Sequence, residues 1–586
     1  MKKASFLRVL LLFAVLMSAI HSRAAAVWTG TTDFPPNYTG WQALPATCFT
    51  EATAGKLIRL KYENLRAGAA AMLYKSDWTA MPGSNGYVTL TGNHTDITIT
   101  PAMQAELQRG GCIVSGAGFT MTAVHVISPS EVSPLRQTVA VEHDWLWSPP
   151  ETPTVSVSIT NPTAAAATAR TELIIRNDRL QPCTTAGRTV TVAAGETVTV
   201  SIGLPPIEPG FYQCMALVND ELARTFTFGY APESIASPPD KQSDFDTFWQ
   251  QAKAQLAATP LDIRMTEMTA KSTARRKVWL VEVRSAADQT GDVFMRAYYA
   301  EPIGPGTSPA IIHYLGYDTG MLTPYCMSGD DMPGYAEMYV SIRGQFINNR
   351  PPYSNPYGTS YFAYGFGSRE NYYYRGAYLD ALRAVDFLYT REKVQRQNIF
   401  AEGSSQGGTL AIAAAALSDG RVSAIAPALF SLCDFPDYFQ LTAWPASEAM
   451  QLKSQLGWTD EQMYQMLSYF DLKNLATMIA CPVFLNFSLQ DDMCPPHCSW
   501  AFYNNLASQE KQFLTNPTLS HETAPNWWTE FLGFFASHQR TDNGMESPLT
   551  AGGQSQDYYS PDGRRLPHAP LRPGLYIRNG KKVAVK

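Results

Sequence analysis

The stretch from Asn398 to Ala416, NIFAEGSSQGGTLAIAAAA, has the pattern of a strand, a tight turn and a helix. The strand-like residues 398–401 lead into Gly403-Ser404-Ser405-Gln406-Gly407, and the mostly small residues 408–416 follow it. A Gly-x-Ser-x-Gly pentapeptide alone is weak evidence, because about 0.2 chance matches are expected in a chain of this length and composition. Between a strand and a helix it predicts a nucleophile elbow, a sharp turn that exposes the Ser405 hydroxyl at a helix N-terminus.

Alternating strand and helix patterns around this turn predict an α/β domain over residues 236–540. The segment 374–389 repeats apolar residues at offsets of three and four, as a helix packed on a sheet requires. Such alternation is typical of a doubly wound, mostly parallel sheet, here that of an α/β-hydrolase. Residues 434–480 interrupt it with helical sequence that could roof an active site. Strands are expected at 278–283, 293–299, 310–314, 339–342, 398–401, 422–427, 481–488 and 511–515.

A serine hydroxyl needs a base to take its proton and an acid to orient that base. In this fold both follow the serine in the chain. Of the histidines after Ser405, His521 lies in the loop between a predicted strand and the last helix, whereas His497 and His538 do not. The acid should follow the strand 481–488, where spacing alone allows either Asp491 or Asp492.

Two β-rich modules are predicted before the α/β domain. Residues 27–147 contain short β-like runs separated by Gly, Pro and Asn, which indicate a β-sandwich. Its Trp28 and Trp41 loosely resemble those of β-sandwich modules attached to glycan-degrading enzymes, so this module could bind carbohydrate. Residues 148–235 alternate apolar and polar residues with period two, which predicts an immunoglobulin-like sandwich that acts as a spacer.

The two ends of the chain indicate export. Basic residues, an apolar run and Ala24-Ala25-Ala26 have the order of a signal peptide over residues 1–26, so the protein is expected in the periplasm, at the cell surface or outside the cell. The Pro- and Gly-rich tail 541–586 could be a sorting segment. Export permits disulfides, and the module boundaries suggest the pairs Cys48–Cys112 and Cys183–Cys214.

Composition limits the partners. The net charge is −6 and no acidic or basic block is present, so nucleic acid is not an expected partner. No internal stretch is long and apolar enough to predict a membrane span.

Further residues resemble those of the acetyl xylan esterase and cephalosporin-C deacetylase family of carbohydrate esterases, over roughly residues 238–540. The resemblance rests on Arg343-Gly344-Gln345, on the elbow pentapeptide and on His521-Glu522, in that order. The segments Tyr372–Asp380 and Asp491-Asp492-Met493-Cys494-Pro495-Pro496 support it.

The resemblance implies the roles of several residues. The acid is Asp491, three positions before Cys-Pro-Pro, and the oxyanion hole consists of the backbone N–H groups of Gln406 and Tyr317, although Leu315 replaces the family's histidine. It also implies an acetylated carbohydrate substrate such as xylan, no metal or organic cofactor, and a homo-oligomer. The residues expected to support the site are Arg343, Gly344, Gln345, Gly403, Gly407 and Glu522.

The expected reaction is therefore deacetylation through an acetyl-enzyme formed on Ser405. Two alternatives remain open at this stage. One is a feruloyl esterase, another short-chain esterase or a serine peptidase on the same fold. The other is a carbohydrate-binding protein whose hydrolase domain is secondary.

Overall fold

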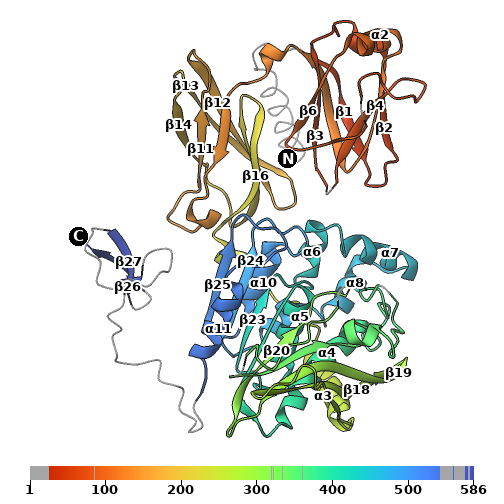
Figure 1. Cartoon of the computed structure of the whole chain (residues 1–586), viewed down its shortest axis with the longest axis vertical. Helices are drawn as coiled ribbons and strands as arrows, with labels where there is room; N and C mark the ends of the chain where they lie inside the picture. The colour runs from red at the N-terminus through yellow and green to blue at the C-terminus, as the bar shows by residue number, and fades with distance from the viewer. Residues whose placement is uncertain are drawn as a thin grey trace. The chain divides into compact units, whose positions relative to one another are not determined.

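In the computed structural model of the chain, residues 25–540 are described except 67, 85, 319, 321, 322, 333 and 359, together with the backbone of 558–559, 574–578 and 581–585. The described chain forms two compact units (Figure 1). Residues 25–143, 149–207 and 212–226 form the N-terminal unit, and 227–540 with 144–148 and 208–211 form the C-terminal unit. The predicted signal peptide and tail lie outside the described residues, except for residues 25–26 and three short strands.

The C-terminal unit is built on one nine-stranded sheet. From β21 to β25 the neighbouring strands are parallel, whereas β17, β18 and β19 are joined antiparallel. In spatial order the strands are β17 (Arg264–Glu267), β18 (Arg276–Asp288), β19 (Gly291–Pro302), β21 (Ala336–Ser341), β20 (Ser308–Tyr314), β22 (Val394–Ser404), β23 (Ala424–Ala428), β24 (Val483–Ser488) and β25 (Lys511–Asn516).

Helices cover both faces of this sheet. On β20, Ile311 belongs to the apolar cluster under α11 (Trp527–Ser537), whereas the Tyr314 hydroxyl donates to the Ala381 carbonyl of α4 (Tyr373–Tyr389) at 2.7 Å. Because side chains alternate across a strand, α11 and α4 lie on opposite faces. Helices α3 (Phe245–Ala258) and α5 (Gln406–Leu417) pack beside α4.

The interruption at 434–480 is helical, as predicted. Its helices are α6 (Phe435–Leu441), α7 (Ala446–Leu456), α8 (Asp460–Leu467) and α9 (Leu472–Ala476), and α10 (Pro496–Asn505) follows β24. The predicted α/β-hydrolase sheet and its helices are therefore confirmed, and β17 is an additional edge strand. Across the described residues, no helix has the length and apolar character needed to cross a bilayer.

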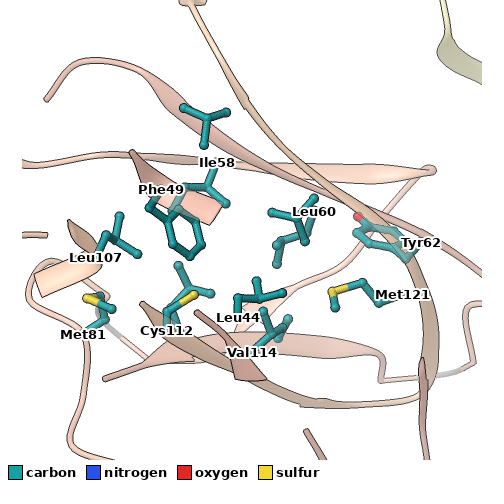
Figure 2. Close-up of a cluster of buried hydrophobic side chains, with 14 of the residues drawn as sticks. Leu44, Phe49, Ile58, Leu60, Tyr62, Met81, Leu107, Cys112, Val114 and Met121 are labelled. Carbon is teal, nitrogen blue, oxygen red and sulfur yellow. The ribbon is translucent and has the colours of Figure 1, made fainter. Parts of the chain in front are cut away.

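The N-terminal unit is rich in β-structure and contains several sheets. Two four-stranded sheets, ordered β1-β8-β3-β6 and β2-β7-β4-β5, pack their inner faces into one apolar core that includes Leu44, Leu60 and Val114 (Figure 2). The strands are β1 (Ala26–Phe34), β2 (Gly40–Leu44), β3 (Leu57–Glu63), β4 (Ala70–Tyr74), β5 (Val88–Thr89), β6 (His94–Thr98), β7 (Cys112–Ala117) and β8 (Phe119–Ile127).

One helix in this unit, α2 (Pro101–Gly110), was not predicted by the β-like pattern. Thr100 caps it by accepting from the Met103 N–H, proline occupies its first turn, and Gly111 ends it with φ 73°. Met103 and Leu107 are buried at an offset of four. The Thr-Pro start and Gly end are ordinary helix boundary signals, so the local sequence did encode this helix.

The remaining strands form two further sheets. β11 (Thr154–Thr160) lies between β14 (Thr197–Gly203) and β9 (Arg136–Val139), and β12 (Ala167–Asn177) lies between β13 (Pro182–Val192) and β15 (Gly210–Val218). β16 (Glu221–Tyr230) follows β15, and β10 (Leu146–Trp147) pairs with its end. Because β9 precedes the predicted boundary at residue 147 but pairs with β11, that boundary does not separate the sheets.

All nine cysteines are free thiols, so neither suggested disulfide is present. Cys183 and Cys214 lie on β13 and β15, which flank β12 on opposite sides. Two strand spacings place their backbones about 9.5 Å apart, beyond the reach of a disulfide. Cys48 is near enough to Cys112 to help raise the pKa of the Cys112 thiol, after the larger effect of burial, but the two remain unbonded.

Candidate active site

Ser405 lies at the turn between β22 and α5 with φ 57° and ψ −128°, a backbone conformation that a side-chain-bearing residue rarely adopts. A Cβ atom at Gly403 would lie 2.5 Å from the Gly407 carbonyl carbon, and one at Gly407 would lie 2.2 Å from the Tyr314 oxygen. The two glycines therefore allow the helix to approach the strands closely. The predicted strand, sharp turn and helix are all present.

The turn leaves Ser405 half-buried at the start of α5. The backbone N–H groups in the first turn of a helix point along its axis and favour negative charge. Gln406 is the first residue of α5, so its N–H belongs to that set. This position suits an oxyanion donor next to the serine.

Asp491 and His521, 30 residues apart in sequence, are brought together by the loops that follow β24 and β25. His521 Nδ1 lies 2.8 Å from Asp491 Oδ2, and Oδ1 of the same carboxylate accepts from the N–H groups of Met493 (2.9 Å) and Cys494 (2.8 Å). Asp491 is buried and Asp492 is exposed. The spacing left both aspartates open, and the structure places Asp491 against the histidine.

The hydrogen bond to Asp491 raises the pKa of His521 above its ordinary value of 6.5, against the opposing effect of burial. The side chain is 31% exposed, so the imidazole is partly accessible from solvent. A histidine in this state can accept a proton near neutral pH and hold the resulting charge against Asp491.

The other two histidines contact different groups. His497 Nε2 lies 3.3 Å from Asp437, and His538 Nε2 lies 2.8 Å from Glu510. Neither distance involves the elbow or the Asp491 loop. Glu522 contributes through its backbone, because its carbonyl accepts from Ser488 Oγ at 2.7 Å and so ties the His521 loop to β24.

Gln345 holds the residue after the serine and the neighbouring loop together. Its amide and that of Gln406 exchange two hydrogen bonds, of 3.1 and 2.9 Å. The Gln345 oxygen also accepts from the Asp318 N–H at 3.0 Å, and Gln406 Nε2 donates to the Gly316 carbonyl at 3.2 Å. The loop that contains Tyr317 is therefore bound on both sides of that residue to the start of α5.

Arg343 links the loop after β21 to α4 and to the end of β18. Its buried guanidinium binds both oxygens of Asp380 on α4 at 2.9 and 2.7 Å, and it also reaches Asp288 at 2.8 Å. A Cβ atom at Gly376 would lie 2.1 Å from Arg343 Nη1, so glycine is needed where the guanidinium crosses α4. Gly344 has φ 68° and accepts a hydrogen bond from the Tyr361 hydroxyl at 2.8 Å. Sequence reasoning did not single out Asp380, although it ends the quoted segment Tyr372–Asp380.

Replacing Arg343 by methionine should lower the free energy of unfolding by about 3–5 kcal/mol, because it strands the buried Asp380 charge. The double change Arg343→Met with Asp380→Leu should recover much of the loss. Denaturant unfolding followed by tryptophan fluorescence measures both. Equal destabilisation of the single and double variants would contradict a role for the ion pair.

The helical segment 434–480 supplies a side chain, Trp444, that packs against Tyr317. Trp444, between α6 and α7, packs its ring edge-on against that of Tyr317 at 5.6 Å. Its indole N–H donates to Glu448 at 3.1 Å, and 37% of the residue is exposed. The Tyr317 hydroxyl accepts from the Tyr361 N–H at 3.0 Å. The sequence predicted the interruption, but nothing in it identified Trp444.

Two groups of side chains among the described residues bring three potential metal ligands together. In the group of Asp491, Cys494 and His521, burial and then the Asp491 charge raise the pKa of the Cys494 thiol well above its usual range, so Cys494 offers no thiolate. In the other, Lys473 Nζ lies 2.9 Å from Asp434 and already supplies positive charge. Both are poor metal sites, and the absence of a cofactor stays a prediction. The groups are Asp491, Cys494 and His521, and Asp434, Asp437 and His497.

Comparison with known proteins identifies relatives. The acetyl xylan esterase family (AXE1) matches residues 233–539, more than half of the chain. The acetyl esterase Axe7A of Xylanibacter ruminicola is 26% identical over 420 residues, which cover 69% of this chain and 91% of that protein.

Solved structures of similar proteins include two acetyl xylan esterases. The one from Paenibacillus sp. R4 is 27% identical and covers 52% of this chain and 98% of that chain, with a TM-score of 0.46. Acetyl xylan esterase 1 from Thermoanaerobacterium sp. JW/SL YS485 is 23% identical and covers 52% and 96%, with a TM-score of 0.45. Because the family match spans the elbow, the Asp491–His521 pair and the sheet that positions them, the chain belongs to the acetyl xylan esterase family and is a carboxylic ester hydrolase.

Proposed function

We propose that this protein is an exported serine esterase that removes O-acetyl groups from acetylated xylan or xylo-oligosaccharides. The observation that carries the proposal is the half-buried Ser405 at a strained elbow in a fold where His521 is paired with Asp491. The family is that of acetyl xylan esterases, which supports acetyl as the acyl group and xylan as the carbohydrate.

The proposed reaction proceeds in two acyl transfers. His521 Nε2 takes the hydroxyl proton as Ser405 Oγ attacks the ester carbonyl, and Asp491 holds the imidazolium that forms. His521 then gives the proton to the departing sugar oxygen, which leaves acetyl-enzyme. Water, deprotonated by the same nitrogen, attacks the acetyl group, and acetate leaves as Ser405 recovers its proton.

The oxyanion is bound in both steps by the N–H groups of Gln406 and Tyr317. This assignment is supported by the hydrogen bonds that tie Gln406 and Gln345 to the segment 316–318, since a fixed donor needs no reorganisation as charge develops. The Leu315 side chain does not alter a backbone donor. Losing one such donor typically costs about 3–4 kcal/mol in the transition state.

A panel of acyl groups on one leaving group tests the specificity. With p-nitrophenyl acetate, butyrate and ferulate, kcat/KM should fall at least tenfold from acetate to butyrate and further to ferulate. Acetate should also be released from acetylated xylo-oligosaccharides. A preference for ferulate, or cleavage of peptide substrates without acetate release, would replace the proposed activity with one of its rivals on the same fold.

Trp444 offers a test of where the sugar binds. Exposed indole beside Tyr317 can stack on a sugar ring, because aromatic faces attract the C–H bonds of pyranoses. Trp444→Ala should raise KM for acetylated xylo-oligosaccharides about tenfold and leave kcat/KM for p-nitrophenyl acetate within about twofold. Trp528→Ala, which removes a similarly exposed indole from α11, is the matched control. Equal losses on both substrates would place Trp444 in support of the fold instead.

Export and module organisation complete the proposal. The order of residues 1–26 supports a signal peptide, and the sheets of the N-terminal unit support two sandwich modules ahead of the esterase domain. The tail 541–586 is proposed as a sorting segment. Fractionation of cells that express the whole chain, or a chain without residues 541–586, tests this; protein retained in the cytoplasm would exclude export, and an unchanged location would exclude sorting by the tail.

A further inference from the structure

Five aromatic residues gather on the outer face of the sheet β2-β7-β4-β5 in the N-terminal unit, a surface called the aromatic platform below. Four of them are unusually exposed: Tyr38 by 48%, Trp41 by 54%, Trp78 by 49% and Tyr87 by 42%. Tyr74 is half-buried among them. Large exposed aromatic patches on a soluble domain usually mark a binding site.

The rings form one continuous surface. Trp78 contacts Trp41 at 5.7 Å and Tyr74 at 5.8 Å between ring centroids. Tyr87 contacts Tyr38 at 4.9 Å, and its hydroxyl lies 3.5 Å from that of Tyr74. Tyr74 therefore joins the two pairs of exposed rings.

The strand register explains why these rings cannot belong to the core. Leu44, Leu73 and Val114 point into the core between the two sheets (Figure 2 shows Leu44 and Val114). Trp41 and Tyr74 lie at odd offsets from Leu44 and Leu73 on the same strands, so they point outward. They flank β7 residues Ser115 and Ile113 and help to bury the outer face of β7, which has no exposed residue.

Two of the rings are presented by the same kind of strained turn. Tyr38 and Trp78 have φ values of 61° and 65°. Each lies between a residue whose side-chain oxygen accepts two hydrogen bonds and the threonine that donates both, in Asn37-Tyr38-Thr39 and Asp77-Trp78-Thr79. The left-handed conformation is unfavourable for a side-chain-bearing residue, yet about half of each residue stays exposed.

The chemistry of the platform favours a neutral sugar polymer. Its polar neighbours include the hydroxyls of Thr39 and Thr79, which follow Tyr38 and Trp78, and the Asn37 amide, whose oxygen accepts from the Thr39 hydroxyl at 2.7 Å. Lys75 and Asp77 pair at 3.4 Å and offset each other's charge. A pyranose presents C–H bonds on its faces and hydroxyls at its rim, so flat rings with a polar border in which the charges of Lys75 and Asp77 offset each other match it in both respects.

We propose that the aromatic platform binds the backbone of a neutral β-linked polysaccharide, xylan in particular. Xylan is chosen because the esterase domain belongs to the acetyl xylan esterase family. A platform in the same chain as the active site would raise the local concentration of ester on an insoluble substrate. The site is separate from Ser405 and does not require the acetyl group.

The test uses the full chain and insoluble xylan from which acetyl groups have been removed by alkali. The wild-type chain should be retained by this xylan, and Trp41→Ala with Trp78→Ala should weaken retention at least tenfold. Tyr325→Ala, which removes a 52% exposed ring from the C-terminal unit, should have no effect. Trp41→Tyr with Trp78→Tyr keeps flat rings and should retain most binding, which separates ring loss from misfolding.

A second readout compares two ester substrates. The alanine double variant should release acetate from insoluble acetylated xylan three- to tenfold more slowly and should hydrolyse p-nitrophenyl acetate at the wild-type rate. No retention of the wild-type chain, or equal retention of the double variant, would overturn the proposal. So would a change in self-association on sedimentation with xylan retention unaltered, since it would assign the platform to a protein partner. Because retention on deacetylated xylan needs no catalysis, its failure is distinguishable from failure of the proposed esterase activity.

Discussion

Ser405→Ala should lower kcat for acetate release by at least about 10⁴-fold, because removing the nucleophile leaves only substrate binding and the oxyanion donors to assist attack by water. The unfolding midpoint should stay near that of the wild-type protein, since Ser405 is half-buried and alanine needs no additional space. Acetate release from acetylated xylo-oligosaccharides measures the effect.

Ser404→Ala is the matched control, because the two serines are adjacent and equally half-buried, but only Ser405 has the elbow conformation. The Ser404 variant should keep more than about half of the activity. If Ser405→Ala retained even one hundredth of the wild-type rate with the purified protein, the nucleophile would have to be another residue.

Asp491→Asn should lower kcat by about 10³- to 10⁴-fold, comparable with the roughly 10⁴-fold loss that the same change causes in a serine protease. The carboxylate accepts from two backbone N–H groups through Oδ1 and from His521 through Oδ2. An asparagine would keep the first contacts through its oxygen and turn its NH₂ group toward Nδ1. His521 would then carry its proton on Nε2, where it cannot act as the base.

Asp492→Asn, the control, removes an equal charge from the exposed neighbour and should change kcat by less than about threefold. Comparable losses in the two variants would show that charge near the loop matters rather than orientation of the imidazole. Steady-state kinetics on p-nitrophenyl acetate is sufficient for the comparison.

The pH dependence of kcat/KM should be set by the ionisation of His521. Only neutral His521 can accept a proton, so kcat/KM should rise with pH through the pKa of His521, which Asp491 raises above 6.5. In Asp491→Asn this limb should move to lower pH. The free energy of unfolding should depend on pH in the opposite sense. The pair of protonated His521 and Asp491 stabilises the folded state fully below the unfolded pKa of about 6.5, and this contribution is lost as pH rises through the folded pKa of His521.

Local sequence encoded most of the sheet. Runs such as 310–314 and 483–488 are short, mostly apolar and bounded by polar turns, and each is a strand in the structure. The more polar run 511–515 was also predicted and is a strand. The same local patterns underlie α4 and the helical interruption at 434–480. The helix α2 was missed although its boundary signals are present, because its only buried residues are Met103 and Leu107.

Local sequence patterns did not predict which strands, far apart in the chain, lie side by side in a sheet. The strand β9 joins β11 across a predicted boundary, and β12 separates Cys183 from Cys214. Alternation of apolar residues shows which face of a strand is buried but not which strand lies beside it. The exposed rings of the aromatic platform likewise come from three separate segments of the chain, those of Tyr38 and Trp41, of Trp78 and of Tyr87.

The sequence by itself determined the nucleophile elbow, since its glycines are needed where Cβ atoms would collide with neighbouring backbone, and it determined the order of strands and helices around it. Spacing left Asp491 and Asp492 open and the family resemblance implied Asp491, which the tertiary structure places against His521. Only the tertiary structure brought Arg343 to Asp380, Gln345 to Gln406 and Trp444 to Tyr317. The physical reason is the range of the interactions: φ values and steric exclusion act between neighbours in the chain, whereas these partners lie 30 to 127 residues apart and meet only when the sheet and its loops have formed.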